Sequence, residues 1–317
     1  MTTVHVPPAG PVSATGRPLD QSPDAFGELR RSNDALDDAA ELRRRLADDG
    51  YLFLPGLLDR DEVLAARRDL LARMAERGQL PDGPDRAELG PDPAAAMGPT
   101  LDGHGEGLNE LPSHSAILQR LLYSGPIIGF YEHLFGEPIR HFDYTWLRLV
   151  GPNGGTPPHM DNVFMNRGTP NLLTAWTPLG DIDRTLGGLA VLERSNHLEE
   201  LKAGYASLDV DTYCLNSADP RHRDAEHGRH WLGYLSDDAV ALRAQLRLRW
   251  LTTDYRAGDL LTFTMFTAHL GLDNNTEDRY RISTDTRYQR ASEPADPRWV
   301  GPNPTGHGPG VVRGVVC

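Results

Sequence analysis

The spacing of apolar residues changes near residue 140, and this change limits the possible folds more than any other feature of the sequence. Before it, apolar side chains recur at helical spacing in three segments: 34–49, 59–76 and 117–135. After it, they follow strand patterns in six segments: 141–150, 171–179, 189–193, 246–253, 260–265 and 280–289. The sequence contains no GxGxxG motif and no regular βαβ repeat. We therefore predict a mainly β chain with added helices, folded as a sandwich, barrel or jelly roll.

Three features of the first half set element boundaries. Asp59 has the character of a helix N-cap, with Glu62 placed three residues later as its capping-box partner. Gly125-Pro126 should divide the helical pattern over 117–135 into two shorter helices, because proline cannot continue a helix. Residues 1–30 are rich in Pro, Gly, Ser and Thr, so we expect a disordered or extended tail there.

The run Pro157-Pro158-His159-Met160-Asp161 carries the first candidate for chemistry. Residues i and i+2 of a strand point to the same side, so His159 and Asp161 could aim at one point. An imidazole and a carboxylate are two of the three ligands in the facial triad that binds non-haem Fe(II). The tripeptide alone is common, so the prediction depends on a histidine supplied by a distant strand.

His269 fits that requirement, because it follows a strand pattern and precedes another. The later strand begins with Arg281, and Arg279 stands two residues before it. The distal C5 carboxylate of 2-oxoglutarate needs a fixed cation, and arginine offers a permanently charged, two-pronged donor. The second half therefore predicts an iron site with 2-oxoglutarate as co-substrate.

These motifs together resemble the phytanoyl-CoA dioxygenase (PhyH) family of Fe(II)- and 2-oxoglutarate-dependent oxygenases, from about residue 36 to 288. The likeness rests on His159-x-Asp161, the run from Gly168 to Gly180, Gly187-Gly188 through Ser195-x-His197, His269, and Arg281-Ile282-Ser283-x-Asp285-x-Arg287-Tyr288. It implies a double-stranded β-helix, the cupin-type jelly roll, with N-terminal helices packed on it. It also implies Fe(II), 2-oxoglutarate and O₂ as the reacting partners.

The resemblance assigns roles to individual residues. It implies that the iron ligands are His159, Asp161 and His269, and that Arg281 grips the C5 carboxylate. It places four more side chains at the co-substrate or on the pocket wall: Trp176, Thr174, Trp146 and Arg148. The implied oxygenase domain covers 31–317, with a helical part over 31–138, a jelly-roll core over 139–290 and a C-terminal extension over 291–317.

Two departures from the family pattern concern the co-substrate. The interval from His269 to Arg281 is one residue longer than usual, which makes Arg279 a rival for the carboxylate. We prefer Arg281 because Ile282-Ser283-x-Asp285 follows it. The position two after the distal histidine is Gly271 where relatives often have serine, so one hydrogen bond to the co-substrate is missing or supplied elsewhere.

Other polar residues have less specific interpretations. His197 is expected to be structural, and Asp259 to be a turn residue. We favour a solvated loop or a substrate lid over a second metal site for His222, His227 and His230. His104 and His114, which flank a Gly-rich loop, are weaker candidates for substrate contacts.

The expected reaction is hydroxylation of an unactivated C–H bond of a small molecule in bacterial secondary, antibiotic-type metabolism. Oxidative ring closure, for example on a sugar-derived antibiotic, desaturation and epimerisation are alternatives because they depend on substrate placement. Halogenation would need a small residue in place of Asp161. A cupin-type isomerase or a non-catalytic binding protein is the alternative of another class, and Arg281 argues against it.

Composition narrows the partners and the compartment. The net charge of −13 disfavours nucleic acid, and no apolar run reaches the roughly 18 residues of a membrane span. The two cysteines, Cys214 and Cys317, form no disulfide framework, and no secretory signal is evident, so we expect a cytoplasmic monomer or homodimer. Of the 32 basic residues only Lys202 is lysine, which favours a high-GC bacterium as the source.

Overall fold

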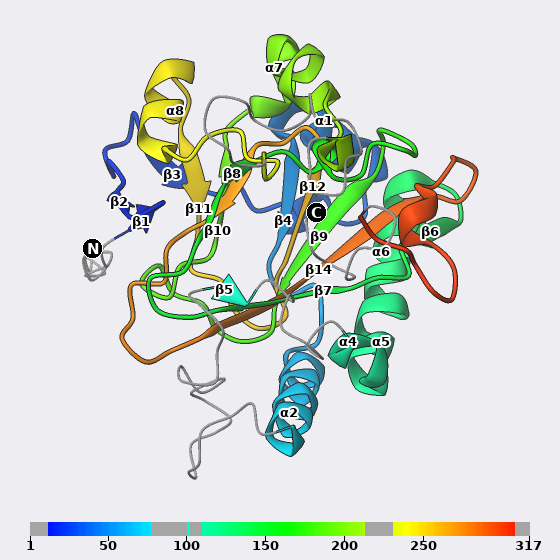
Figure 1. Ribbon diagram of the computed structural model, residues 1–317. Helices are drawn as coiled ribbons and strands as arrows, with labels where there is room; N and C mark the ends of the chain where they lie inside the picture. The colour runs from blue at the N-terminus through cyan, green and yellow to red at the C-terminus, as the bar shows by residue number, and fades with distance from the viewer. Residues whose placement is uncertain (1–11, 78–99, 102–109, 213–230, 308–317) are drawn as a thin grey trace, which may run out of the picture.

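Two β-sheets face each other at the centre of the molecule (Figure 1), in a computed structural model that describes residues 12–77, 100–101, 110–212 and 231–307. One sheet has five strands in the order β3 (Phe26–Glu28), β11 (Trp250–Thr252), β10 (Leu189–Leu192), β13 (His269–Gly271) and β8 (Thr156–His159). The other has the order β4 (Tyr51–Leu54), β12 (Leu260–Thr264), β9 (Leu173–Pro178), β14 (Arg281–Arg290), β7 (Trp146–Val150) and β5 (Thr100–Leu101), with β6 (Ile139–His141) also paired to β14. Two facing, mainly antiparallel sheets form the predicted jelly roll.

Strand β14 divides its side chains between two different environments. Alternation places Arg281, Asp285 and Arg287 in the space between the sheets, where all three line one cavity. Tyr288 points to the other face, where its ring stacks on Tyr131 with centroids 4.2 Å apart. One strand thus supplies polar groups to the interior of the jelly roll and apolar contacts to the helices outside it.

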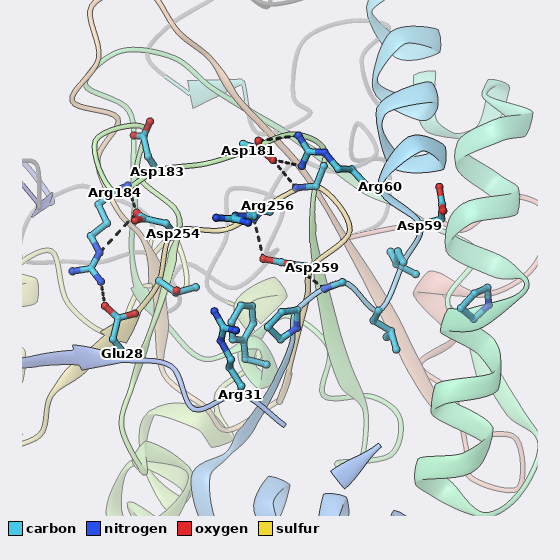
Figure 2. A pocket seen from close by; sticks show the side chains of 18 of the residues that line it. Glu28, Arg31, Asp59, Arg60, Asp181, Asp183, Arg184, Asp254, Arg256 and Asp259 are labelled. Atoms are coloured by element: carbon cyan, nitrogen blue, oxygen red, sulfur yellow. Dashed lines mark hydrogen bonds and ion pairs between the residues drawn. The ribbon is translucent and has the colours of Figure 1, made fainter. Parts of the chain in front are cut away.

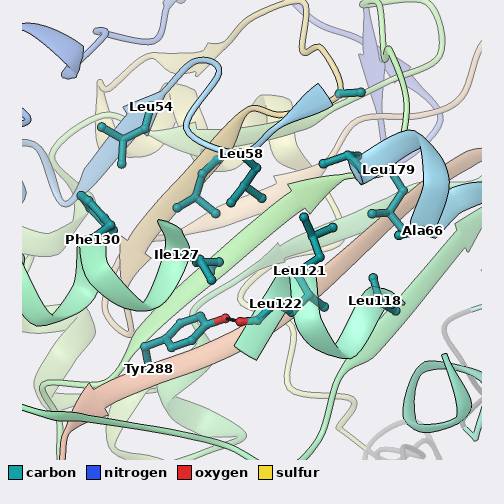
Figure 3. Close-up of a cluster of buried hydrophobic side chains, with 14 of the residues drawn as sticks. Leu54, Leu58, Ala66, Leu118, Leu121, Leu122, Ile127, Phe130, Leu179 and Tyr288 are labelled. Carbon is teal, nitrogen blue, oxygen red and sulfur yellow. Dashed lines mark hydrogen bonds between the residues drawn. The ribbon is translucent and has the colours of Figure 1, made fainter. Parts of the chain in front are cut away.

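Helices cover the outer face of the seven-stranded sheet. They are α1 (Ala39–Asp49), α2 (Arg60–Glu76), α4 (Leu111–His114), α5 (Ala116–Tyr123) and α6 (Pro126–Phe135). Their apolar stripes join sheet residues in one buried cluster (Figure 3), in which the Tyr288 hydroxyl donates to the carbonyl of Leu122. The predicted helix boundaries are confirmed at two places: Asp59 caps α2 by accepting from the Glu62 amide, and the chain breaks between α5 and α6 at Gly125.

Short elements complete the described chain. The hairpin strands are β1 (Ser13–Ala14) and β2 (Arg17–Pro18), and the remaining α-helices are α7 (Glu199–Ala203) and α8 (Ala239–Leu246). The 3₁₀ turns are η1 (Asn33–Ala35), η2 (Asp161–Val163), η3 (Ser195–His197), η4 (Tyr205–Ser207), η5 (Val210–Thr212) and η7 (Pro297–Trp299). Within these described ranges, no helix is both long enough and apolar enough to cross a membrane.

Several predicted boundaries were wrong. Residues 12–30 are extended but do not form a detached tail, because β3 pairs in parallel with β11 and Phe26 is buried. The strand expected over 246–253 begins only at Trp250, since α8 continues to Leu246. The strand expected over 141–150 is interrupted, with β6 ending at His141 and β7 starting at Trp146.

The described part of the C-terminal extension is packed into the molecule. Trp299 is fully buried, and its ring lies 4.8 Å from that of Trp146. The carboxylate of Asp211 accepts from Nη1 of Arg298 at 2.6 Å, and its other oxygen lies 2.9 Å from Nδ1 of His307. These buried polar contacts fasten residues 298–307 to the segment that precedes residue 213.

Candidate metal centre

Three ligand-type side chains meet between the two sheets. His159 ends β8, His269 begins β13, and the two residues are direct partners in the ladder between these strands. Nε2 of each imidazole lies 3.8 Å from Oδ1 of Asp161. The three ligand atoms lie within 4.8 Å of one another, the only such group of His, Cys, Asp and Glu residues in the described ranges. One cation could therefore contact all three.

The backbone brings His159 and Asp161 together in a different way from the one expected. We predicted that both residues would lie on a strand and point to the same side. Instead β8 ends at His159, and Asp161 is the first residue of the 3₁₀ turn η2. The turn, and not strand alternation, directs the carboxylate toward the imidazoles.

Backbone carbonyls orient both imidazoles. Nδ1 of His159 lies 2.8 Å from the carbonyl oxygen of Pro157, and Nδ1 of His269 lies 2.9 Å from that of Thr267. A carbonyl can only accept, so each Nδ1 carries the proton and each Nε2 keeps a lone pair for a metal. Burial, followed by the charge of His269, lowers the pKa of His159 to about 3, and burial also lowers the pKa of His269. Both rings are therefore neutral near pH 7, as metal ligation requires.

Asp161 is held from the opposite sheet. Its Oδ2 lies 3.0 Å from Nη2 of Arg287 and also accepts the hydroxyl of Thr174. Burial acts to raise the pKa of Asp161, but the positive charge of Arg287, the adjacent imidazoles and the hydrogen bond from Thr174 outweigh it, and the net pKa falls well below the usual range. The carboxylate is therefore ionised. No role was predicted for Arg287, although strand alternation places it on the same face as Arg281.

Arg281 lies close to this group and Arg279 does not. The Arg281 side chain is 3% exposed, and its Nη1 donates to the carbonyl of Gly187 and, at 3.3 Å, to that of Leu272. Arg279 is on the surface, paired with Asp183 at 2.9 Å. The structure thus places the preferred arginine at the candidate centre and its rival outside.

A cavity of about 30 Å³ joins the triad to Arg281. Its lining consists of Arg148, Thr156, His159, Asp161, Thr174, Trp176, Leu189, His269, Gly271, Arg281, Asp285 and Arg287. Of the four side chains expected near the co-substrate, Arg148, Trp176 and Thr174 line this cavity. Nε of Arg148 donates to Asp285 at 2.8 Å, and Trp146 reaches the site through Arg287, whose guanidinium lies 4.7 Å from the centre of its ring.

Gly271 is explained by its neighbours. A Cβ atom at this position would lie 2.8 Å from Nη2 of Arg281 and 3.2 Å from Oγ1 of Thr156. Because the guanidinium fills the space that a side chain would need, glycine accommodates Arg281 as it is placed here. The departure from the usual serine is therefore coupled to the position of the arginine.

The remaining predicted polar residues lie away from the cavity or outside the described ranges. Nε2 of His197 lies 2.9 Å from the carbonyl of Asp48, a contact between segments that suits a structural role. His114 is exposed, and its ring bonds to the carbonyl of Glu110 in its own helix. The Asp259 carboxylate accepts the amides of Gly56 and Arg256, as a turn residue would. His104, His222, His227 and His230 fall outside the described residues.

A larger cavity of about 1530 Å³ lies elsewhere, between the loop after β4, the loop after β9 and the turn before β12 (Figure 2). Charged side chains of both signs line it, and several neutralise one another, as Arg60 and Asp181 do at 2.6 Å. None of the three ligand-type residues of the triad reaches this cavity. Its size would favour the larger cavity as the functional site, but the metal-ligating groups lie at the smaller cavity.

The residues at the small cavity fit a non-haem iron site with an anionic co-substrate. Two neutral imidazole nitrogens and one carboxylate oxygen form the donor set of the facial triad, which suits Fe(II) and leaves coordination positions open. Arg281 supplies a buried guanidinium in the same cavity, where a second carboxylate could be bound through two hydrogen bonds.

Comparisons with known proteins agree with this geometry. The family profile described as phytanoyl-CoA dioxygenase (PhyH) matches residues 46–283. A 1-deoxypentalenic acid 11-beta-hydroxylase from Streptomyces arenae is 27% identical over 281 residues, which cover 85% of this chain and 87% of that protein. The enzyme of the same name from Streptomyces exfoliatus is 26% identical over 269 residues, covering 81% and 83%.

Solved structures share the fold. The epimerase SnoN, in complex with Fe³⁺, alpha ketoglutarate and nogalamycin RO, superimposes with a TM-score of 0.52 at 22% identity, covering 88% of this chain and 96% of that chain. The carbocyclase SnoK from nogalamycin biosynthesis superimposes with a TM-score of 0.52 at 17% identity, covering 83% and 88%. At these identities the likeness supports the jelly-roll fold.

Proposed function

The chain belongs to the phytanoyl-CoA dioxygenase (PhyH) family of non-haem iron, 2-oxoglutarate-dependent oxygenases, and we propose that it hydroxylates an unactivated C–H bond of a small molecule in bacterial secondary metabolism. One observation carries the proposal: a buried His-Asp-His group and a buried arginine share a cavity between the sheets. That combination suits a metal and a dicarboxylate together. A cupin-type isomerase or binding protein would have no need of the guanidinium.

His159, Asp161 and His269 would hold the iron, and Arg281 would bind the C5 carboxylate of 2-oxoglutarate. When bound, the iron uses 2-oxoglutarate and O₂ to oxidise a C–H bond of the substrate. The chain's own part is positioning. Hydrogen bonds from Nδ1 to backbone carbonyls fix the rotation of both imidazoles, and burial keeps bulk water from the ionised carboxylate.

Hydroxylation is preferred to the other outcomes because the two Streptomyces relatives described above, at 27% and 26% identity, are both named as hydroxylases. Their named substrate, 1-deoxypentalenic acid, supports a small organic molecule as the substrate class here. Ring closure, desaturation and epimerisation would need the same metal and co-substrate but a different placement of the substrate. The Arg148–Asp285 pair on the cavity wall offers polar groups that could direct that placement.

We further propose the partners, the compartment and the domain organisation of the enzyme. A net charge of −13 argues against nucleic acid as a partner, and the protein is proposed to act in the cytoplasm as a monomer or homodimer. Residues 31–317 are proposed to form a single oxygenase domain, to which strand β3 (Phe26–Glu28) is now added because it pairs with β11.

Anaerobic visible absorption tests the metal and co-substrate together. The purified protein is titrated with Fe(II) and then with 2-oxoglutarate, and a weak charge-transfer band that needs both additions is expected. His159→Ala should abolish the band, whereas His114→Ala, which removes an exposed histidine that does not line the cavity, should leave it unchanged. Absence of the band in the wild type, with metal still bound, would refute the proposal and favour a cupin-type function.

A further inference from the structure

The two oxygens of the Asp161 carboxylate have different surroundings. Oδ1 faces the imidazoles, 3.8 Å from Nε2 of His159 and 3.8 Å from Nε2 of His269. Oδ2 faces the other sheet, where it accepts the hydroxyl of Thr174 and lies 3.0 Å from Nη2 of Arg287. One oxygen is thus directed at the metal position, and the other is occupied by two protein donors.

The two donors are placed by the same sheet. Thr174 on β9 and Arg287 on β14 are direct register partners, and their side chains project from the same face. The backbone positions of both residues are set by two central strands of the seven-stranded sheet. The pair therefore forms a fixed clamp on the carboxylate and does not depend on a flexible loop.

Aromatic packing restrains the guanidinium further. Arg287 is 2% exposed and lies over the ring of Trp146, 4.7 Å from its centre. Trp146 is itself packed between Tyr144 at 4.6 Å and Trp299 at 4.8 Å. A cation held between an aromatic face and a carboxylate, out of contact with water, has little freedom to turn away.

We propose that Thr174 and Arg287 are positioning residues that keep Asp161 a ligand through one oxygen only. A carboxylate can bind a metal through one oxygen or through both, and the second mode would occupy a coordination position that the co-substrate needs. Two donors that occupy Oδ2 prevent this mode. The inference rests on the proposed function, because it takes the triad as the metal site.

Thr174→Val is the main test, because valine has nearly the shape of threonine and lacks only the donor. Thr177→Val is the matched control: Thr177 lies on the same strand, is fully buried, and its hydroxyl has no hydrogen-bond partner among the residues that the structure describes. Both variants are loaded with Co(II) in place of iron, without O₂. Metal affinity, the visible d–d spectrum of Co(II), and the affinity of the loaded protein for 2-oxoglutarate are then measured.

Thr174→Val is expected to weaken 2-oxoglutarate binding by about 10- to 100-fold, the size of the loss in metal affinity or activity that follows removal of a group orienting a metal ligand. Its Co(II) spectrum should change, and its metal affinity should fall less than its affinity for 2-oxoglutarate. Thr177→Val should match the wild type in all three measurements. Identical behaviour of the two variants would overturn the proposal.

Variants of Arg287 provide the second arm. Arg287→Met removes the guanidinium beside the buried Asp161 carboxylate, so its folding is checked by thermal unfolding, and Arg287→Lys keeps the charge on a smaller donor. The lysine variant should recover part of the 2-oxoglutarate affinity that the methionine variant loses; equal affinities for the two would contradict the clamp. If the wild type binds no Co(II), the proposed function fails, whereas normal wild-type binding with an unchanged Thr174→Val refutes this inference alone.

Discussion

Replacing Arg281 by methionine should separate co-substrate binding from metal binding. Arg281 is 3% exposed and lines the cavity of the triad, so a carboxylate bound there would be paired out of contact with water. Deleting one partner of a buried ion pair costs about 3–5 kcal/mol. At about 1.4 kcal/mol for each tenfold change, the Kd of 2-oxoglutarate should rise by roughly 100- to 4,000-fold. Affinity for Co(II) should change far less, because Arg281 is not one of the three ligand-type residues and its Nη1 is bound to backbone carbonyls.

Arg279→Met is the matched control for this prediction, since the same side chain is removed two residues away. Arg279 pairs with Asp183 at 2.9 Å on the surface, where the two side chains are 41% and 50% exposed. Exposed pairs contribute about 0.2–1 kcal/mol, so the Kd should change by less than about fivefold. Anaerobic calorimetry on Co(II)-loaded protein measures both constants. Equal effects of the two substitutions, or a larger effect of Arg279→Met, would refute the assignment of Arg281.

Three further substitutions test the framework around the site. Tyr288→Phe should destabilise the protein by about 1–3 kcal/mol in urea unfolding, because it leaves the buried Leu122 carbonyl without its donor, while 2-oxoglutarate affinity stays unchanged. Gly187→Ala should lower both stability and 2-oxoglutarate affinity, because φ is +76° and the residue's carbonyl supports Arg281. Burial acts to raise the pKa of Asp211, but hydrogen bonds and positive charge from His307 and Arg298 lower it to about 2. Because this pKa is lowered, the stability that the ionised carboxylate contributes is fully present above the ordinary value of 3.8 and is lost as the pH falls through 2. Asp211→Asn should therefore lower the free energy of unfolding by about 1–2 kcal/mol at pH 7, after allowance for solvent screening, and by almost nothing below pH 2.

Features decided by neighbouring residues were predictable from the sequence. The cap at Asp59 and the break at Gly125-Pro126 depend on a few adjacent positions, and both are confirmed. The strand β3 could not be predicted in this way, because its polar, proline-rich surroundings resemble a tail. Its partner β11 lies in the other half of the chain, and only that pairing makes Phe26–Glu28 part of a sheet.

The candidate site likewise has features that the sequence predicts from neighbouring residues and features that depend on distant ones. The spacing of His159 and Asp161 led to the correct pair of neighbours but for the wrong local reason, because the chain turns between them. The position of Arg287 could have been predicted, because strand alternation places it on the same face as Arg281. The sequence does not show the partner of Arg287, because a strand arginine acquires this role only when a carboxylate from a distant turn lies opposite it.

The position of His159 at the margin of its sheet has a consequence for how the protein holds together. Strand β8 comes last in the five-stranded order, and two of its four residues are prolines, which have no amide hydrogen to contribute to a ladder. A cation shared by His159 and its ladder partner His269 would act as a cross-link at the weakest seam of the sheet. Loss of the ion would then loosen this edge first. Metal removal by a chelator, proteolysis and thermal unfolding would all begin at strand β8.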